Sequence, residues 1–249
     1  MPGVMFHKDD KHMSLKPDEE FVKNCLLKHF GGTSTAWEGE DPPDIYMKVD
    51  GEIIAVEITR LSPVSFDENG IVQNRNTEDN FGINLCNELN SKMGKEIPPE
   101  INIILTLYVP VENARNYKKQ LRQLLNDTIR KGIEIGNEYE FNIAGEKVEI
   151  NIIPIRKYSQ KKVVGIIFNK NSSTHIQSNA EIILSERLLD KVKKCKNIKY
   201  QGSKWLALFN DYWLADHEMY AAALNNITIG HNFDRILVIT HAGQVYQVH

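Results

Sequence analysis

Cysteine, long apolar runs and an excess of one charge sign are all scarce in this chain of 249 residues. Its three cysteines, Cys25, Cys86 and Cys195, stand far apart. Because an odd, dispersed set makes neither a disulfide framework nor a CxxC metal clip, we expect a reducing, cytoplasmic setting. No run approaches the roughly 18 apolar residues that a membrane span needs, so we expect no membrane partner. The polar start also lacks the apolar segment of a signal peptide.

The charges nearly cancel, with 30 Lys plus Arg against 33 Asp plus Glu and a formal net charge of -3. This balance excludes a strongly basic coat for nucleic acid, although a local basic patch remains compatible with it. Hydrophobic residues make up 41% of the chain, which is typical of a globular protein and excludes collagenous and largely disordered classes.

Apolar periodicity predicts helices and strands that alternate from end to end. Helices are expected over residues 16–30, 77–93, 112–133, 181–194 and 216–224. Strands are expected over 34–38, 44–49, 52–60, 101–109, 138–143, 147–154, 163–168, 205–209, 235–240 and 244–248, with a loop over 61–75. We therefore predict a loose leader at residues 1–15, then a single α/β domain over 16–249 with a mixed sheet flanked by helices.

One predicted hairpin carries most of the chemical information. Asp50-Gly51 is a dipeptide favoured in two-residue hairpin turns, and it pairs positions whose numbers sum to 101. That register places Asp44 directly opposite Glu57, with Cβ atoms about 4.5–5.5 Å apart. Two carboxylates so placed repel each other unless a cation lies between them, and Mg²⁺ prefers such oxygen ligands.

The two faces of this hairpin differ in character. Because side chains alternate along a strand, Thr59 shares the face of Glu57. The opposite face is apolar and suited to a core: Ile45, Met47, Val49, Ile54, Val56 and Ile58. An apolar side joined to a metal-binding side suits phosphodiester hydrolysis, in which a metal activates water and stabilises charge on the phosphoryl group.

Pro43-Asp44, followed after twelve residues by Glu57-Ile58-Thr59, resembles the PD-(D/E)xK, or restriction-endonuclease-like, nuclease superfamily. The resemblance implies a restriction-endonuclease-like fold, in which an N-terminal helix precedes an antiparallel meander. It also implies Asp44 and Glu57 as Mg²⁺ ligands, with Mn²⁺ as an alternative ion, and Glu20 or Glu19 as an acid from the preceding helix. In element order, helix then three strands then helix then strand, it extends from Lys16 to about Val109.

The sequence departs from this motif at Thr59, where the superfamily has a lysine that positions or activates the attacking water. Lys48 shares the face of Asp44 but lies roughly 13 Å along the strand, so it is a poor replacement. Arg60 points to the other face of a regular strand. Lys92 or Lys95 would reach the site only if their helix packs over it.

Each candidate also has an ordinary structural explanation. Asp44 suits a turn after two prolines, Glu20 suits a first helical turn through the helix dipole, and Thr59 is a common strand residue. Directly opposed carboxylates favour a metal site over a structural hairpin. A lysine-rich run could be a solvated helix face or a basic track for nucleic acid: Lys191, Lys193, Lys194, Lys196 and Lys199, with Lys161-Lys162 and Arg156-Lys157.

These observations predict a Mg²⁺-dependent nuclease that hydrolyses DNA, with Asp44, Glu57, Thr59 and Glu20 as its site residues. The alternative is a catalytically degenerate protein of the same fold that binds nucleic acid or assembles with a partner, because the motif lysine is missing. A third alternative is RNA or another phosphodiester as substrate. Cleavage of both strands of a duplex would favour a homodimer.

Overall fold

The computed structural model describes residues 15–155, 161–196 and 200–249. The chain divides into two compact units, the first formed by residues up to Ser62 together with His175–His249, and the second by Pro63–Thr174. The second unit is thus an insertion into the sequence of the first, where one domain over 16–249 had been expected. The predicted leader lies outside the described residues except for Leu15.

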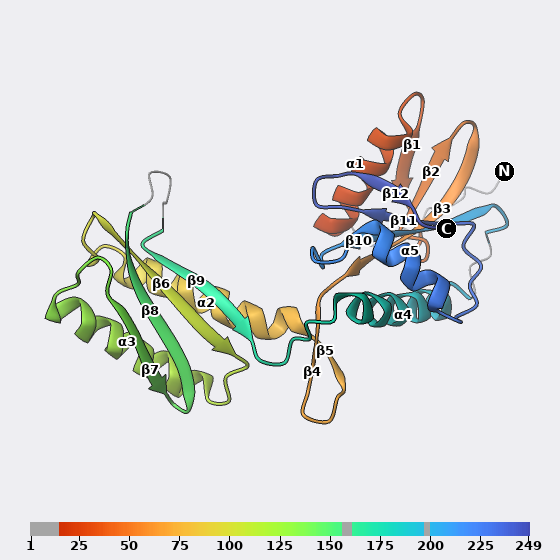
Figure 1. The fold of residues 1–249 in the computed structure, drawn as a ribbon. Coiled ribbons are helices and arrows are strands. Elements are labelled where there is room, and N and C mark those ends of the chain that lie inside the picture. The colour runs from red at the N-terminus through yellow and green to blue at the C-terminus, as the bar shows by residue number, and fades with distance from the viewer. Residues whose placement is uncertain (1–14, 156–160, 197–199) are drawn as a thin grey trace, which may run out of the picture. The chain divides into compact units, whose positions relative to one another are not determined.

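The first unit is built on a mixed six-stranded sheet (Figure 1). Its strands, in spatial order, are β1 (Thr35–Glu38), β2 (Ile45–Val49), β3 (Glu52–Leu61), β10 (Ser203–Asn210), β11 (Arg235–Ile239) and β12 (Val245–Gln247). β1, β2 and β3 form the expected antiparallel meander, and β10 then joins β3 in parallel. Five consecutive residues of β3 are buried, as is typical of a central strand that is covered on both faces.

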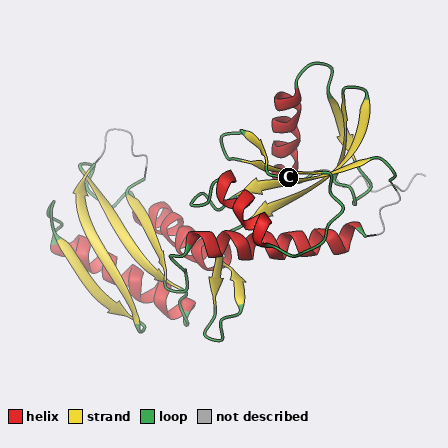
Figure 2. Cartoon of the chain, turned by 45° about the vertical axis from the view of Figure 1, so that its right-hand side comes forward, coloured by secondary structure: helices red, strands yellow, loops and turns green. Residues whose placement is uncertain are grey.

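Helices cover both faces of this sheet (Figure 2). They are α1 (Pro17–Phe30), α4 (Ile176–Cys195) and α5 (His217–Asn226). α1 begins with proline in its first turn, ends at Gly31 with φ 57°, and packs Val22 and Leu26 into the core that contains Val56. α4 contacts β3 on its other face. Because side chains alternate along β3, Glu57 is turned away from the α1 core and toward α4.

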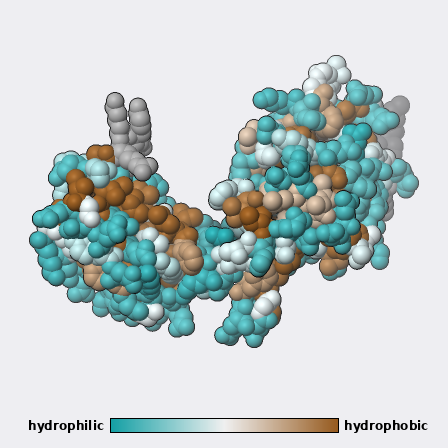
Figure 3. All heavy atoms as spheres, in the orientation of Figure 1, coloured by the Kyte–Doolittle hydropathy of each residue, from teal (hydrophilic) through white to brown (hydrophobic). Residues whose placement is uncertain are grey.

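The second unit has its own sheet and core. It consists of β4 (Val64–Phe66), β5 (Val72–Asn74), α2 (Arg75–Met93), β6 (Ile101–Val109), α3 (Ala114–Lys131), β7 (Glu138–Ile143), β8 (Glu146–Pro154) and β9 (Val163–Asn169). The sheet order is β7-β8-β6-β9, and its inner side chains, such as Leu105, pack with Leu89 of α2 and Leu121 of α3. The opposite face exposes Ile166 and Phe168, and Figure 3 shows a hydrophobic patch on this unit.

The mixed α/β character is confirmed, whereas two local expectations were wrong. Residues 61–75, expected as a loop, contain the short β4–β5 hairpin. The strands form three sheets rather than one, because β6 pairs with β8 and β9 and not with strands of the first unit. Within the described chain, no helix is long and apolar enough to cross a membrane. All three cysteines are buried and free.

Candidate metal centre

The β2–β3 hairpin has the register that the sequence predicts, from Val49 opposite Glu52 to Ile45 opposite Val56. Asp50 and Gly51 both have positive φ values, 49° and 90°, as a two-residue turn of this kind requires. Asp44 lies one residue before β2, while β3 continues to Leu61. The hairpin therefore opens beside the carboxyl-terminal half of β3.

The Asp44 side chain replaces a backbone hydrogen bond of β3 where the pairing with β2 ends. Its Oδ2 accepts a hydrogen bond of 2.6 Å from the backbone N–H of Ile58, one residue beyond Glu57. A buried N–H without a partner is costly, so this bond both completes β3 and fixes the Asp44 carboxyl group next to Glu57. The structural role and the chemical position of Asp44 thus have the same cause.

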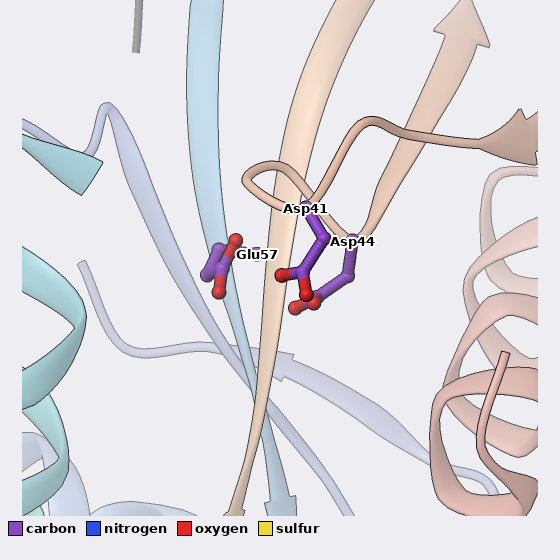
Figure 4. A group of neighbouring side chains, drawn as sticks. All are labelled: Asp41, Asp44 and Glu57. Carbon is purple, nitrogen blue, oxygen red and sulfur yellow. The ribbon is translucent and has the colours of Figure 1, made fainter. Parts of the chain in front are cut away.

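A third carboxylate, Asp41, joins the two that the sequence predicts. Asp41, Asp44 and Glu57 each offer an oxygen, and these oxygens all lie within 4.8 Å of one another. In Figure 4, Asp41 and Asp44 project from the loop before β2 on the same side, across from Glu57. The loop turns back on itself, with Gly39 N–H donating to the Asp44 carbonyl at 3.0 Å. Asp41 was missed because its approach depends on this turn, and the only sequence signal was the Asp-Pro-Pro-Asp segment.

Two lysines of α4 complete the cluster. The Nζ atoms of Lys191 and Lys194 lie 2.5 and 2.6 Å from Glu57 Oε1. Lys194 also lies 2.5 Å from Asp41 Oδ1, and the two ammonium groups are 3.6 and 3.5 Å from Asp44. The sequence placed both lysines on a solvated helix face or a nucleic-acid track. The structure instead aims them at the carboxylates, which lie more than a hundred residues earlier in the chain.

The centre of the cluster is almost free of solvent. Glu57 is 2% exposed and Asp44 8% exposed. Glu57 Oε1 receives both lysines, whereas its Oε2 is buried and has no hydrogen-bond partner among the described residues. A buried carboxylate oxygen without a partner is energetically unfavourable, so this atom is available as a metal ligand.

The electrostatics follow from this burial. Burial, and then the negative charge of Glu57, raise the pKa of Asp44 from 3.8 to about 6, although the lysines oppose the shift. The hydrogen bond from Lys194 lowers the pKa of Asp41. Burial alone would lower the pKa of Lys194, but its bonds to Asp41 and Glu57 outweigh burial and raise it. Three carboxylates against two ammonium groups leave the fully ionised cluster one negative charge in excess, which favours a cation.

A small pocket of about 200 Å³ adjoins the cluster and is lined by Asp44, Lys191 and Lys194, but not by Asp41 or Glu57. Its lining includes Thr59 and Glu19, the alternative helix acid. Glu20 does not line this pocket and is paired with Lys23 at 2.6 Å on the outside of α1. Of the two acids that the resemblance implies, the structure therefore brings Glu19 to the site.

Two of the other basic residues considered from the sequence lie away from the carboxylates, and a third lines the adjoining pocket. Lys48 is exposed opposite Ile53, and Lys92 forms an ion pair of 2.8 Å with Glu88 of the second unit. Arg60 also lines the pocket, where it pairs with Asp18 and, at 3.2 Å, with Asp211. Arg156 and Lys157 lie outside the described residues. Only the α4 lysines, among the replacements within the described chain, contact the carboxylates.

The donor set fits a hard divalent cation. Carboxylate oxygens from Asp41, Asp44 and Glu57 are ligands that Mg²⁺ and Mn²⁺ accept, and the described cluster contains no histidine or thiolate ligand. Comparisons with family models, with curated proteins and with solved structures found no match to this chain. The assignment of the site therefore depends on its own geometry.

Proposed function

We propose that the protein is a metal-dependent nuclease that hydrolyses DNA phosphodiester bonds. Asp44, Glu57 and Asp41 would hold Mg²⁺, or Mn²⁺ in its place. The observation that carries the proposal is the unpartnered, buried Oε2 of Glu57, within a group of three acidic side chains of which Asp44 lines a pocket. Carboxylates brought together in this way repel one another, which destabilises the fold but favours binding of a cation.

The order of elements in the first unit supports the same proposal. α1, β1, β2, β3, α4 and β10 follow one another as helix, three strands, helix and strand once the second unit is set aside. This is the order implied by the resemblance to the restriction-endonuclease-like superfamily. The sequence had assigned its later helix and strand to residues 77–109, which belong to the inserted unit.

Lys191 and Lys194 would replace the positive charge that is missing at Thr59, the position of the motif lysine. When bound, the metal would supply a more acidic water and positive charge for the phosphoryl oxygens. Lys191 and Lys194 keep positive charge beside the same carboxylates, so a phosphodiester group in the pocket would meet ammonium groups from α4. They would supply the charge that the motif lysine brings from the strand. Asp44 and Glu57 would be ligands, and Glu19 would line the entrance.

The degenerate alternative has an observation of its own. The same two lysines neutralise most of the carboxylate charge without any metal. A cluster satisfied in this way can persist as a structural ion network in a protein that binds nucleic acid without cutting it. Metal binding and cleavage separate the two functions.

The test is cleavage of labelled DNA and RNA by the full chain with Mg²⁺ or Mn²⁺, beside calorimetric titration of each metal. Asp44→Ala and Glu57→Gln should abolish both cleavage and metal binding. Glu52→Gln is the matched control, because Glu52 is an exposed acid of the same hairpin. Unchanged cutting by either site variant would refute the assignment, and no metal binding by the natural protein would favour the degenerate alternative. If both strands of a duplex are cut, sedimentation of the active protein tests whether it is a homodimer.

A further inference from the structure

The outward face of α3 is strongly basic. This helix has six cationic residues and one acid, Asp127, in a protein whose net charge is -3. The cations are Arg115, Lys118, Lys119, Arg122, Arg130 and Lys131. Such a concentration within a nearly neutral chain indicates a surface for an anionic partner.

The helix is held so that these charges face outward. Tyr117, Leu121 and Leu125 are buried in the core of the second unit and anchor the opposite side of α3. Arg115, Lys119 and Arg130 are exposed. At 1.5 Å per residue, the span from Arg115 to Arg130 is about 22 Å. The helix therefore fixes the spacing of the backbone positions that carry the cations, four of them within the two turns from Arg115 to Arg122 and Arg130 about two turns later.

This row borders an open groove of about 930 Å³ between α3 and Glu88 of α2. Glu88 pairs with Arg122 and lies 3.8 Å from Lys118, so it orders two of the cations in the groove. The lining is completed by side-chain amides and the remaining charged residues: Asn113, Arg115, Asn116, Lys119, Gln123, Asn126, Asp127 and Arg130. Amides and cations together are the usual partners of phosphate and sugar oxygens.

We infer that the α3 groove binds the sugar-phosphate backbone of duplex DNA. The inference deepens the proposed function, because it says where the substrate of that nuclease is held. Single strands are bound mainly by stacking of unpaired bases on aromatic rings, and the groove lining, all of it within the described chain, includes no aromatic residue. A row of cations and amides instead suits the regular phosphates of a duplex.

The second unit is connected directly to the elements that carry the candidate metal centre. The second unit leaves the first after β3 and returns at α4, the two elements that carry Glu57 and the site lysines. DNA held by α3 would thereby be bound to the same chain that carries the candidate metal centre. In the first unit, Lys191 and Lys194 are already engaged with carboxylates, so they are poorly suited to long-range capture.

The test measures binding of the full chain to a short labelled DNA duplex by fluorescence anisotropy in EDTA, over a series of salt concentrations. Arg115→Gln combined with Lys119→Gln removes two exposed cations of the groove. Lys28→Gln combined with Lys48→Gln removes two exposed cations of the first unit and is the matched control. Circular dichroism confirms that each variant is folded.

Each phosphate contact contributes about 0.9 to the slope of log K for binding against log salt concentration. Loss of two contacts in the α3 variant should therefore reduce this slope by about 2 and weaken binding at least about tenfold in 0.1 M salt. The control should bind as the natural protein does. Equal losses in both variants, or no loss in the α3 variant, would overturn the inference, as would tighter binding of single-stranded DNA or of RNA. Because EDTA removes divalent metal, failure of binding and failure of catalysis are observed separately.

Discussion

Replacing Asp44 with asparagine should stabilise the metal-free protein while abolishing its proposed activity. Asp44 is buried and lies beside Glu57, and its pKa is raised from 3.8 to about 6 by burial and then by that neighbouring charge. The asparagine side chain would retain an oxygen that accepts the hydrogen bond from Ile58 N–H, and it would remove the charge. The ionised carboxylate is therefore tolerated at a cost to the fold.

The size and the sign of the effect follow from the two pKa values. A shift of about 2 units corresponds to about 3 kcal/mol, since each unit is worth 1.36 kcal/mol. The folded protein binds this proton more tightly than the unfolded chain. The ionised Asp44 carboxylate therefore lowers the free energy of unfolding of the natural protein by the full amount above pH 6. This destabilisation disappears as the pH falls from about 6 to about 4. Asp44→Asn should be more stable by about 3 kcal/mol at pH 7.5, and by nearly nothing below pH 4.

The assay is urea unfolding of both proteins in EDTA at pH 7.5, 6, 5 and 4, with thermal unfolding as a second measurement. The expected difference raises Tm by roughly 6–12 °C for a protein of this size. Added Mg²⁺ should close the gap by stabilising the natural protein alone. A variant less stable than the natural protein at pH 7.5, or a difference that does not change with pH, would refute this account of Asp44.

Two further substitutions probe the same cluster. Lys191→Met should lower the free energy of unfolding by about 2 kcal/mol at pH 7.5, because buried Glu57 loses one of its two ammonium partners. Urea unfolding measures this change, and a variant more stable than the natural protein would contradict the prediction. Gly39→Ala should lower the free energy of unfolding by about 2 kcal/mol and weaken Mg²⁺ binding. The new Cβ would collide with the Pro43 carbonyl in the loop that carries Asp41 and Asp44. Calorimetric metal binding equal to that of the natural protein would contradict this prediction.

Most of the helices and strands could be predicted because their signals are local. The predicted strand over residues 101–109 matches β6, and that over 138–143 matches β7, since apolar alternation marks a strand whatever it pairs with. The choice of partner is not local. β10 pairs with β3 across an insertion of more than one hundred residues, while β6 pairs with β8 and β9 inside that insertion. For this reason the sequence predicted one domain, whereas the chain forms two units.

The sequence by itself determined the core of the candidate site. A two-residue turn and strict alternation along two adjacent strands were enough to bring Asp44 and Glu57 together. Only the tertiary structure decided the rest. Asp41 approaches through a loop that folds back on itself, and Lys191 reaches Glu57 from a helix that packs on the sheet. Such long-range contacts depend on packing between elements, which leaves no periodic signal in the sequence.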